Sequence, residues 1–110
     1  MTEAEGRFDR VVQALLEENG VTPPDARRGS FGSNGLKVNG KIFAMLVRGD
    51  LVVRLPKQRV DGLVASGDGQ RFDPRHDGRV MREWLVLSPS SALDWASLAA
   101  EALAFTRTRR

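Results

Sequence analysis

The residues with the most obvious potential for chemistry lie in a glycine-rich segment, RRGSFGSNG, at residues 27–35. Arg27 and Arg28 precede three closely spaced glycines, and backbone amides in such loops can bind phosphate. Phosphate-binding loops, however, connect a strand to the N-terminus of a helix, whereas this segment follows a proline-containing loop and leads into a predicted strand. We therefore interpret the glycines as turn residues and retain only the two arginines as candidates for binding.

A second group of candidates combines basic and aromatic side chains around the predicted sheet. Aromatic rings on a sheet face can stack nucleic-acid bases, and neighbouring basic groups can contact the phosphates. The alternative is that Phe43 and Trp84 belong to the core or to a dimer interface, because only 6% of the residues are aromatic. The candidate nucleic-acid-binding residues are Arg27, Arg28, Lys37, Lys41, Arg54, Arg79 and Arg82.

Residues suited to catalysis or to metal binding are scarce. The chain has no cysteine, which excludes a disulfide framework and thiolate chemistry. Its single histidine, His76, lies between Asp73 and Asp77, but three ligands within one short glycine-flanked loop are a poor match to a zinc site. We recognise no serine–histidine pair and no carboxylate pair on an apolar wall. The sequence therefore predicts a protein that is not an enzyme and that needs no cofactor and no metal.

The charge distribution supports a nucleic-acid alternative. The net charge is +3. This excess equals the charge of the three C-terminal arginines, Arg107, Arg109 and Arg110. Most of the other basic side chains lie in residues 27–82, whereas residues 1–26 are acidic overall. Positive surfaces attract the phosphates of nucleic acids. The other interpretation is a solvated surface of mixed charge.

The length and composition predict one globular domain. The chain has 110 residues, of which 41% are hydrophobic and 28% are charged. We expect a single domain over residues 1–106, followed by a basic C-terminal tail at residues 107–110. The N-terminus lacks the apolar stretch of a secretory signal, and no apolar run approaches the roughly 20 residues that cross a bilayer. These features predict a cytoplasmic protein with no membrane partner.

Hydrophobic periodicity and turn residues predict the first elements. Apolar residues recur at the spacing of one helix face over residues 3–19, and Thr2 and Glu5 match a capping box at its start. Asn39-Gly40 is the preferred pair for a type I′ turn, and Gly49-Asp50 forms a second tight turn. These turns separate three predicted strands, which cover residues 36–38, 41–48 and 51–55.

The remaining elements complete an α+β fold. A helix is expected from Pro56 to Gly67, a loop over residues 67–79, a strand over residues 80–87 and a helix over residues 91–105. The predicted fold is a two-layer domain with an antiparallel sheet of about four strands, in the order α-β-β-β-α-β-α.

Both faces of the predicted sheet are apolar. If each tight turn has two residues, the register places on one face Ile42, Ala44, Leu46, Leu51, Val53 and Leu55. A single layer of helices covers only one face, so the N-terminal helix, a partner subunit or a ligand must cover the other. The residues predicted for this dimer or ligand face are Leu36, Val38, Phe43, Met45, Val47, Val52 and Trp84.

An ordered series of short motifs resembles the N-terminal domain of the TfoX/Sxy family. The entry motif is FGSNGL at residues 31–36, the hairpin motif is NGKIFA at residues 39–44, and GRVM at residues 78–81 ends the later loop. The sequence LVVRLP at residues 51–56 matches a strand between them, and the likeness covers residues 7–105. The related MmcQ/YjbR-like family, which is often labelled DNA-binding, shares the hairpin motif.

The resemblance implies a two-layer α/β domain with an antiparallel sheet and a link to the regulation of natural competence in bacteria. It implies no catalytic residues, and the named members are longer proteins with a second, C-terminal domain outside the region of likeness. We therefore expect a small non-enzymatic interaction or regulatory domain that forms a homodimer or binds a protein partner. The alternatives are a DNA- or RNA-binding protein and a small-molecule-binding domain with a concavity near Phe43 and Trp84.

Overall fold

The computed structural model describes residues 2–24, 35–73, 78 and 81–108. The predictions that involve Arg27, Arg28, His76, Asp77 and Arg79 fall outside these residues. The described residues form three helices and six strands in the order α-β-β-β-β-α-β-β-α. The elements are α1 (Glu3–Leu15), β1 (Val21–Thr22), β2 (Gly35–Val38), β3 (Lys41–Val47), β4 (Asp50–Arg54), α2 (Lys57–Ala65), β5 (Gln70–Phe72), β6 (Met81–Leu87) and α3 (Trp95–Thr108).

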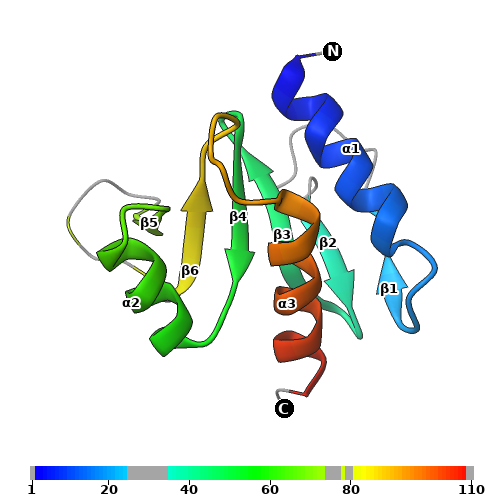
Figure 1. Cartoon of the computed structure of the whole chain (residues 1–110). Coiled ribbons are helices and arrows are strands. Elements are labelled where there is room, and N and C mark those ends of the chain that lie inside the picture. The colour runs from blue at the N-terminus through cyan, green and yellow to red at the C-terminus, as the bar shows by residue number, and fades with distance from the viewer. Residues whose placement is uncertain (1, 25–34, 74–77, 79–80, 109–110) are drawn as a thin grey trace.

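The strands form one antiparallel sheet in the order β1-β2-β3-β4-β6-β5. All three helices lie on the same side of this sheet (Figure 1). A single core cluster between the two layers contains residues of every helix, among them Phe8, Val60 and Leu103. The predicted α+β class and antiparallel sheet are confirmed.

The predicted number of strands is wrong, because two short edge strands were missed. The first, β1, is two residues long and lies between Gly20 and Pro23, and β5 lies in the segment that was predicted to be a loop. Strands of two or three residues are too short to show an alternation of apolar and polar side chains. The neighbouring turn residues therefore favoured a loop. Short edge strands also limit unwanted pairing with other chains.

The predicted capping box of α1 is confirmed. The Thr2 hydroxyl accepts a hydrogen bond from the Glu5 amide, and the Glu5 carboxylate accepts one from the Thr2 amide, both at 3.1 Å. The same contacts to Thr2 lower the pKa of Glu5. The helix ends at Leu15, four residues before the predicted end, and Gly20 adopts a positive φ of 83° on the way into β1.

The two predicted hairpins form, but the second turn begins one residue earlier than expected. Asn39 and Gly40 both have positive φ, as a type I′ turn requires. In the second hairpin, Arg48 and Gly49 have the positive φ values, and Val47 pairs with Asp50. The register between β3 and β4 is therefore shifted by two residues from the predicted one, which leaves the assignment of side chains to faces unchanged.

An irregularity between β2 and β3 overturns the predicted face for Leu36, Val38, Ile42 and Phe43. Ile42, which was predicted to lie with Ala44 and Leu46, instead lies on the opposite side of the sheet. Leu36 pairs with Ala44 and Lys37 with Ile42, so Phe43 is an extra residue in β3. A β-bulge of this kind reverses the alternation on one side of the extra residue. As a result, the residues predicted for the dimer or ligand face do not all lie on the same side of the sheet. Leu36, Val38 and Phe43 are instead fully buried in the core cluster beneath the helices.

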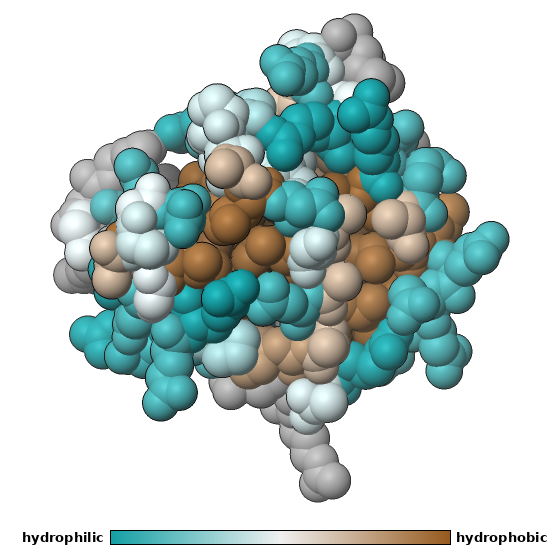
Figure 2. All heavy atoms as spheres, viewed as in Figure 1, coloured by the Kyte–Doolittle hydropathy of each residue, from teal (hydrophilic) through white to brown (hydrophobic). Residues whose placement is uncertain are grey.

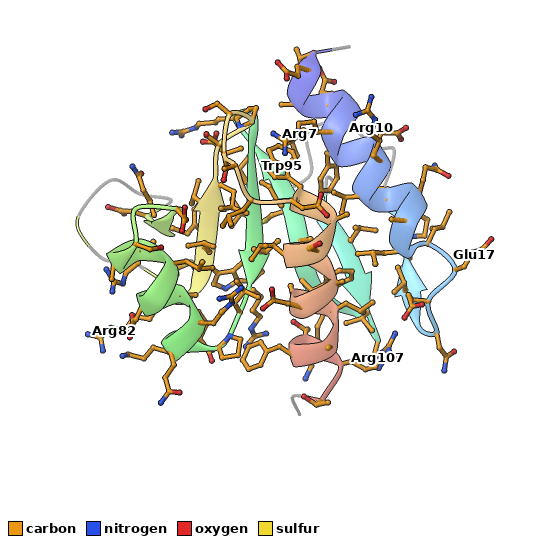
Figure 3. The ribbon with its side chains drawn as sticks, in the orientation of Figure 1. Arg7, Arg10, Glu17, Arg82, Trp95 and Arg107 are labelled. Atoms are coloured by element: carbon orange, nitrogen blue, oxygen red, sulfur yellow. The ribbon has the colours of Figure 1, made fainter. Side chains whose placement is uncertain are left out.

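The C-terminal helix starts and ends later than predicted. It spans Trp95–Thr108, so Arg107 belongs to the helix and not to a tail. The Arg107 guanidinium donates a hydrogen bond to the Asn19 carbonyl at 3.1 Å and lies 3.7 Å from the Glu18 carboxylate. This contact joins the end of α3 to the segment after α1, as Figure 3 shows for the labelled Arg107 side chain.

Asp94, the residue before α3, is expected to stabilise the fold as a helix cap. Hydrogen bonds from the Ser97 hydroxyl and from the backbone amides of Ser97 and Ala96 lower the pKa of Asp94. Asp94→Ala should lower the free energy of unfolding by about 1 kcal/mol at pH 7, and Asp94→Asn by less, because asparagine keeps an acceptor. Urea unfolding of the three proteins measures both values.

The contribution of the Asp94 charge should also depend on pH. Its folded-state pKa lies below the ordinary value of 3.8, so the stabilisation is present above about pH 4 and is lost as the pH falls through the folded-state pKa. The difference between the wild-type chain and Asp94→Asn should therefore shrink between pH 7 and pH 3. An unchanged difference over that range would contradict a cap that depends on the ionised carboxylate.

Candidate interaction surface

The side of the sheet away from the helices carries a continuous apolar centre. Direct cross-strand pairing aligns Met45 of β3, Val52 of β4 and Val86 of β6. Strand alternation extends this group in both directions. We call it the second sheet face and define it as Lys37, Ile42, Met45, Val47, Asp50, Val52, Arg54, Trp84 and Val86.

No described helix packs on the second sheet face. Figure 1 places α1, α2 and α3 together on the other side, so the N-terminal helix, one of the three covers considered, does not lie on this face. Val52 is completely buried although it does not belong to the core cluster, whereas Met45, Trp84 and Val86 are only partly buried. The face thus keeps apolar surface that the described residues do not cover.

The helix side of the molecule differs from the second sheet face in the side chains at its surface. Viewed from that side, the helices present mostly hydrophilic side chains, with apolar residues visible between them (Figure 2). Arg59 of α2 donates hydrogen bonds to the Glu101 carboxylate of α3 at 3.0 and 3.2 Å, which links these two helices at the surface. Partly exposed ion pairs of this type contribute little to stability, and we assign them no binding role.

Two of the predicted basic residues, Lys37 and Arg54, lie at the Trp84 end of the second sheet face. Arg54 pairs directly with Trp84, and Lys37 lies on the same side of β2. The side chain of Arg82 is exposed, but β6 is irregular between Met81 and Leu85 where it pairs with β5, so strand alternation does not assign Arg82 to this face. The remaining described candidate, Lys41, pairs with Val38 beside the first hairpin turn and therefore falls on the helix side.

Arg54 is held within the sheet by a charged neighbour. Its guanidinium lies 3.7 Å from the Glu83 carboxylate. Its Nε atom is buried and has no hydrogen-bond partner. The Glu83 charge offsets that of Arg54, and Lys37 remains as the other basic group at this end of the face.

The opposite end of the face is acidic and hollowed. A hollow of about 590 Å³ is lined by the side chains of Asp50, Gln70, Val86 and Ser88 and by the loops at residues 67–69 and 90–92. Its side chains include the carboxylates of Asp50 and Asp68 but no basic group. Arg48 lies in the adjoining turn and has an interaction of its own.

Both walls of this hollow are held by contacts to the core. The Trp95 indole donates a hydrogen bond to the Ser88 carbonyl at 3.2 Å, and the Arg7 guanidinium donates to the Pro89 carbonyl and lies 4.6 Å above the Trp95 ring. Figure 3 shows Arg7 and Trp95 directed toward one another from α1 and α3. On the other wall, the Asp68 amide donates to the Leu63 carbonyl. These contacts preorganise the hollow.

The predicted small-molecule concavity near Phe43 and Trp84 does not form. Phe43 is fully buried beneath the helices, and Trp84 lies on the opposite face of the sheet. Within the described residues, no group of three acidic or histidine side chains is arranged to hold a metal ion. Asp73, from the predicted loop cluster, accepts a hydrogen bond from the Gly78 amide at 3.1 Å.

The chain matches no protein-family model, no curated protein and no solved structure. Nor does any helix in the described part of the chain have the length and apolar character needed to cross a membrane. The residues missed by sequence reasoning are those of the acidic hollow, Asp50, Gln70 and Ser88, which come from three separate segments. Of these three residues, only Asp50 belonged to a predicted feature, the Gly49-Asp50 turn.

Proposed function

We propose that this chain is a small non-enzymatic interaction domain that self-associates through the second sheet face. The observation that carries the proposal is the partly buried apolar surface of Met45, Trp84 and Val86 around the fully buried Val52, on which no described helix packs. Apolar sheet faces are stabilised when a second layer removes them from water. The resemblance to TfoX N-terminal domains supports a regulatory role in bacteria for such a dimer.

A charge placed at the centre of the face should abolish the dimer. Met45→Glu would bring a carboxylate into the interface, where a buried unpaired charge is strongly unfavourable. We expect Met45→Glu to elute as a 12.1 kDa monomer in size-exclusion chromatography with light scattering, at concentrations where the wild-type chain is dimeric.

The matched control is Leu16→Glu. Leu16 is 37% exposed and lies at the end of α1, on the helix side of the molecule. This substitution adds the same charge without touching the second sheet face, so the variant should remain a dimer. Loss of the dimer in both variants would point to a general effect of charge and would contradict the proposed interface.

A second candidate function is binding of single-stranded nucleic acid on the same face. It is favoured by Arg54 beside Trp84 and by Lys37 at the same end of the face, because binding of single strands combines base stacking on aromatic rings with basic contacts to phosphates. A fluorescent 30-base single strand that binds at 50 mM salt and is released at 200 mM would support this function. Absence of binding at 50 mM salt would exclude it.

A further inference from the structure

All three asparagines of the chain are followed by glycine, a pair in which the asparagine side chain can react with the next backbone amide. Glycine has no side chain to hinder the approach of its nitrogen to the asparagine carboxamide. The structure describes two of these pairs, Asn19-Gly20 and Asn39-Gly40, whereas Asn34 lies outside the described residues. The two described pairs touch, since the Asn39 amide donates a hydrogen bond to the Gly20 carbonyl at 3.0 Å.

The peptide group between Asn19 and Gly20 is contacted by a cation. The Arg107 guanidinium donates a hydrogen bond to the Asn19 carbonyl oxygen at 3.1 Å. This oxygen and the Gly20 nitrogen belong to one resonant amide, so the negative charge of the deprotonated nitrogen is shared with the oxygen. A positively charged donor at the oxygen stabilises that anion and raises its fraction. The Glu18 carboxylate, 3.7 Å from the same guanidinium, offsets part of this effect.

The Gly20 nitrogen and the Asn19 side chain are free to meet. Both residues are exposed, and among the described residues the Gly20 amide donates no hydrogen bond. Asn19 lies between α1 and the two-residue strand β1, in a turn closed by the hydrogen bond from the Val21 amide to the Glu18 carbonyl at 3.2 Å. Little structure therefore opposes the rotation about the Asn19 Cα–C bond that ring closure requires.

Asn39 is held more firmly. It has a φ of 52° in a two-residue turn, and the flanking residues Val38 and Lys41 are paired. A Cβ atom added at Gly20 would lie 2.6 Å from the Asn39 Oδ1 atom, so the Asn39 carboxamide packs against Gly20. Rotation of the Asn39 backbone would have to open the hairpin. The structure thus favours reaction at Asn19 over reaction at Asn39.

We infer that Asn19-Gly20 is a site of spontaneous deamidation and that Arg107 promotes the reaction there. The deprotonated Gly20 nitrogen attacks the side-chain carbonyl carbon of Asn19, and the new C–N bond closes a succinimide ring. The bond from that carbon to the side-chain nitrogen breaks, and this nitrogen leaves as ammonia with the proton that Gly20 gave up. Water then opens the ring at either carbonyl, which yields aspartate or isoaspartate. The inference does not depend on the proposed self-association.

Peptide mapping of the aged chain measures each site separately. After incubation of the folded chain at pH 7, trypsin releases the three asparagines in different peptides, at residues 11–27, 29–37 and 38–41. Mass spectrometry after chromatography that resolves isoaspartate gives a rate for each site. Conversion should be faster at Asn19 than at Asn39 in the folded chain, and the two rates should become similar in urea. A folded-state rate at Asn19 no higher than that at Asn39 would overturn the inferred site.

Substitutions test the role of the cation. Arg107→Gln keeps a hydrogen-bond donor without the charge and should lower the Asn19 rate about threefold, a modest change because exposed charges interact weakly. Arg107→Lys should lower it less, and Glu18→Gln should raise it. The Asn39 rate in the same molecules is the internal control and should not change. An Asn19 rate that is unchanged or higher in Arg107→Gln would show that Arg107 only restrains this segment, which would contradict promotion by the cation.

Discussion

Replacing Phe43 by alanine is expected to lower the free energy of unfolding by about 3–5 kcal/mol. The bulge in β3 turns this ring into the core beneath the helices, where it is fully buried. Truncation there removes apolar burial and leaves a cavity that the packed layers cannot fill. Met45→Ala, two residues along the same strand but on the second sheet face, should cost less than half as much in the monomer.

Urea unfolding at a concentration below the dimer dissociation constant measures both effects. The comparison is informative because regular alternation would place Phe43 and Met45 on the same face. Equal losses for the two variants would show that Phe43 does not pack under the helices. The bulge would then be absent, and the second sheet face would have to be redefined.

Replacing Gly69 by alanine is expected to destabilise the chain by about 1–3 kcal/mol. A methyl group at this position would lie 2.7 Å from the Leu85 Cδ1 atom and 3.1 Å from the Val86 carbonyl oxygen, and the carbonyl belongs to the backbone of β6. The strand or the loop must therefore move. Thermal unfolding followed by circular dichroism should show a lower midpoint.

Gly62→Ala is the control for this substitution. Gly62 lies within α2, and a methyl group there would meet nothing within 4 Å. Because alanine is the better helix former, Gly62→Ala should raise the free energy of unfolding by about 1 kcal/mol. A stabilising effect of Gly69→Ala would mean that the loop wall of the acidic hollow does not pack against β6.

Much of the fold could be predicted because local signals and tertiary structure agree. The capping box at Thr2 and Glu5 and the Asn39-Gly40 turn each depend on a few adjacent residues, and both form as expected. The start of α3 was misplaced because Ser90 and Ser91 are also good caps. In the structure, the Ser91 hydroxyl accepts a hydrogen bond from the Leu93 amide, and the helix begins after Asp94.

The faces of the sheet could not be predicted fully. One extra residue at Phe43 moves Leu36 and Val38 to the other side, and no turn residue or proline marks the bulge in the sequence. The candidate surface depends on long-range register in the same way. Arg54 and Trp84 are brought together by the pairing of β4 with β6, whereas Asp50 acquires its neighbours from loops far along the chain.

The most direct test of the second sheet face as an interface is the mass of the wild-type chain in solution. Light scattering over a series from about 1 to 500 µM should show a rise from the 12.1 kDa monomer to twice that mass. A mass that stays at 12.1 kDa throughout the series would contradict self-association through this face.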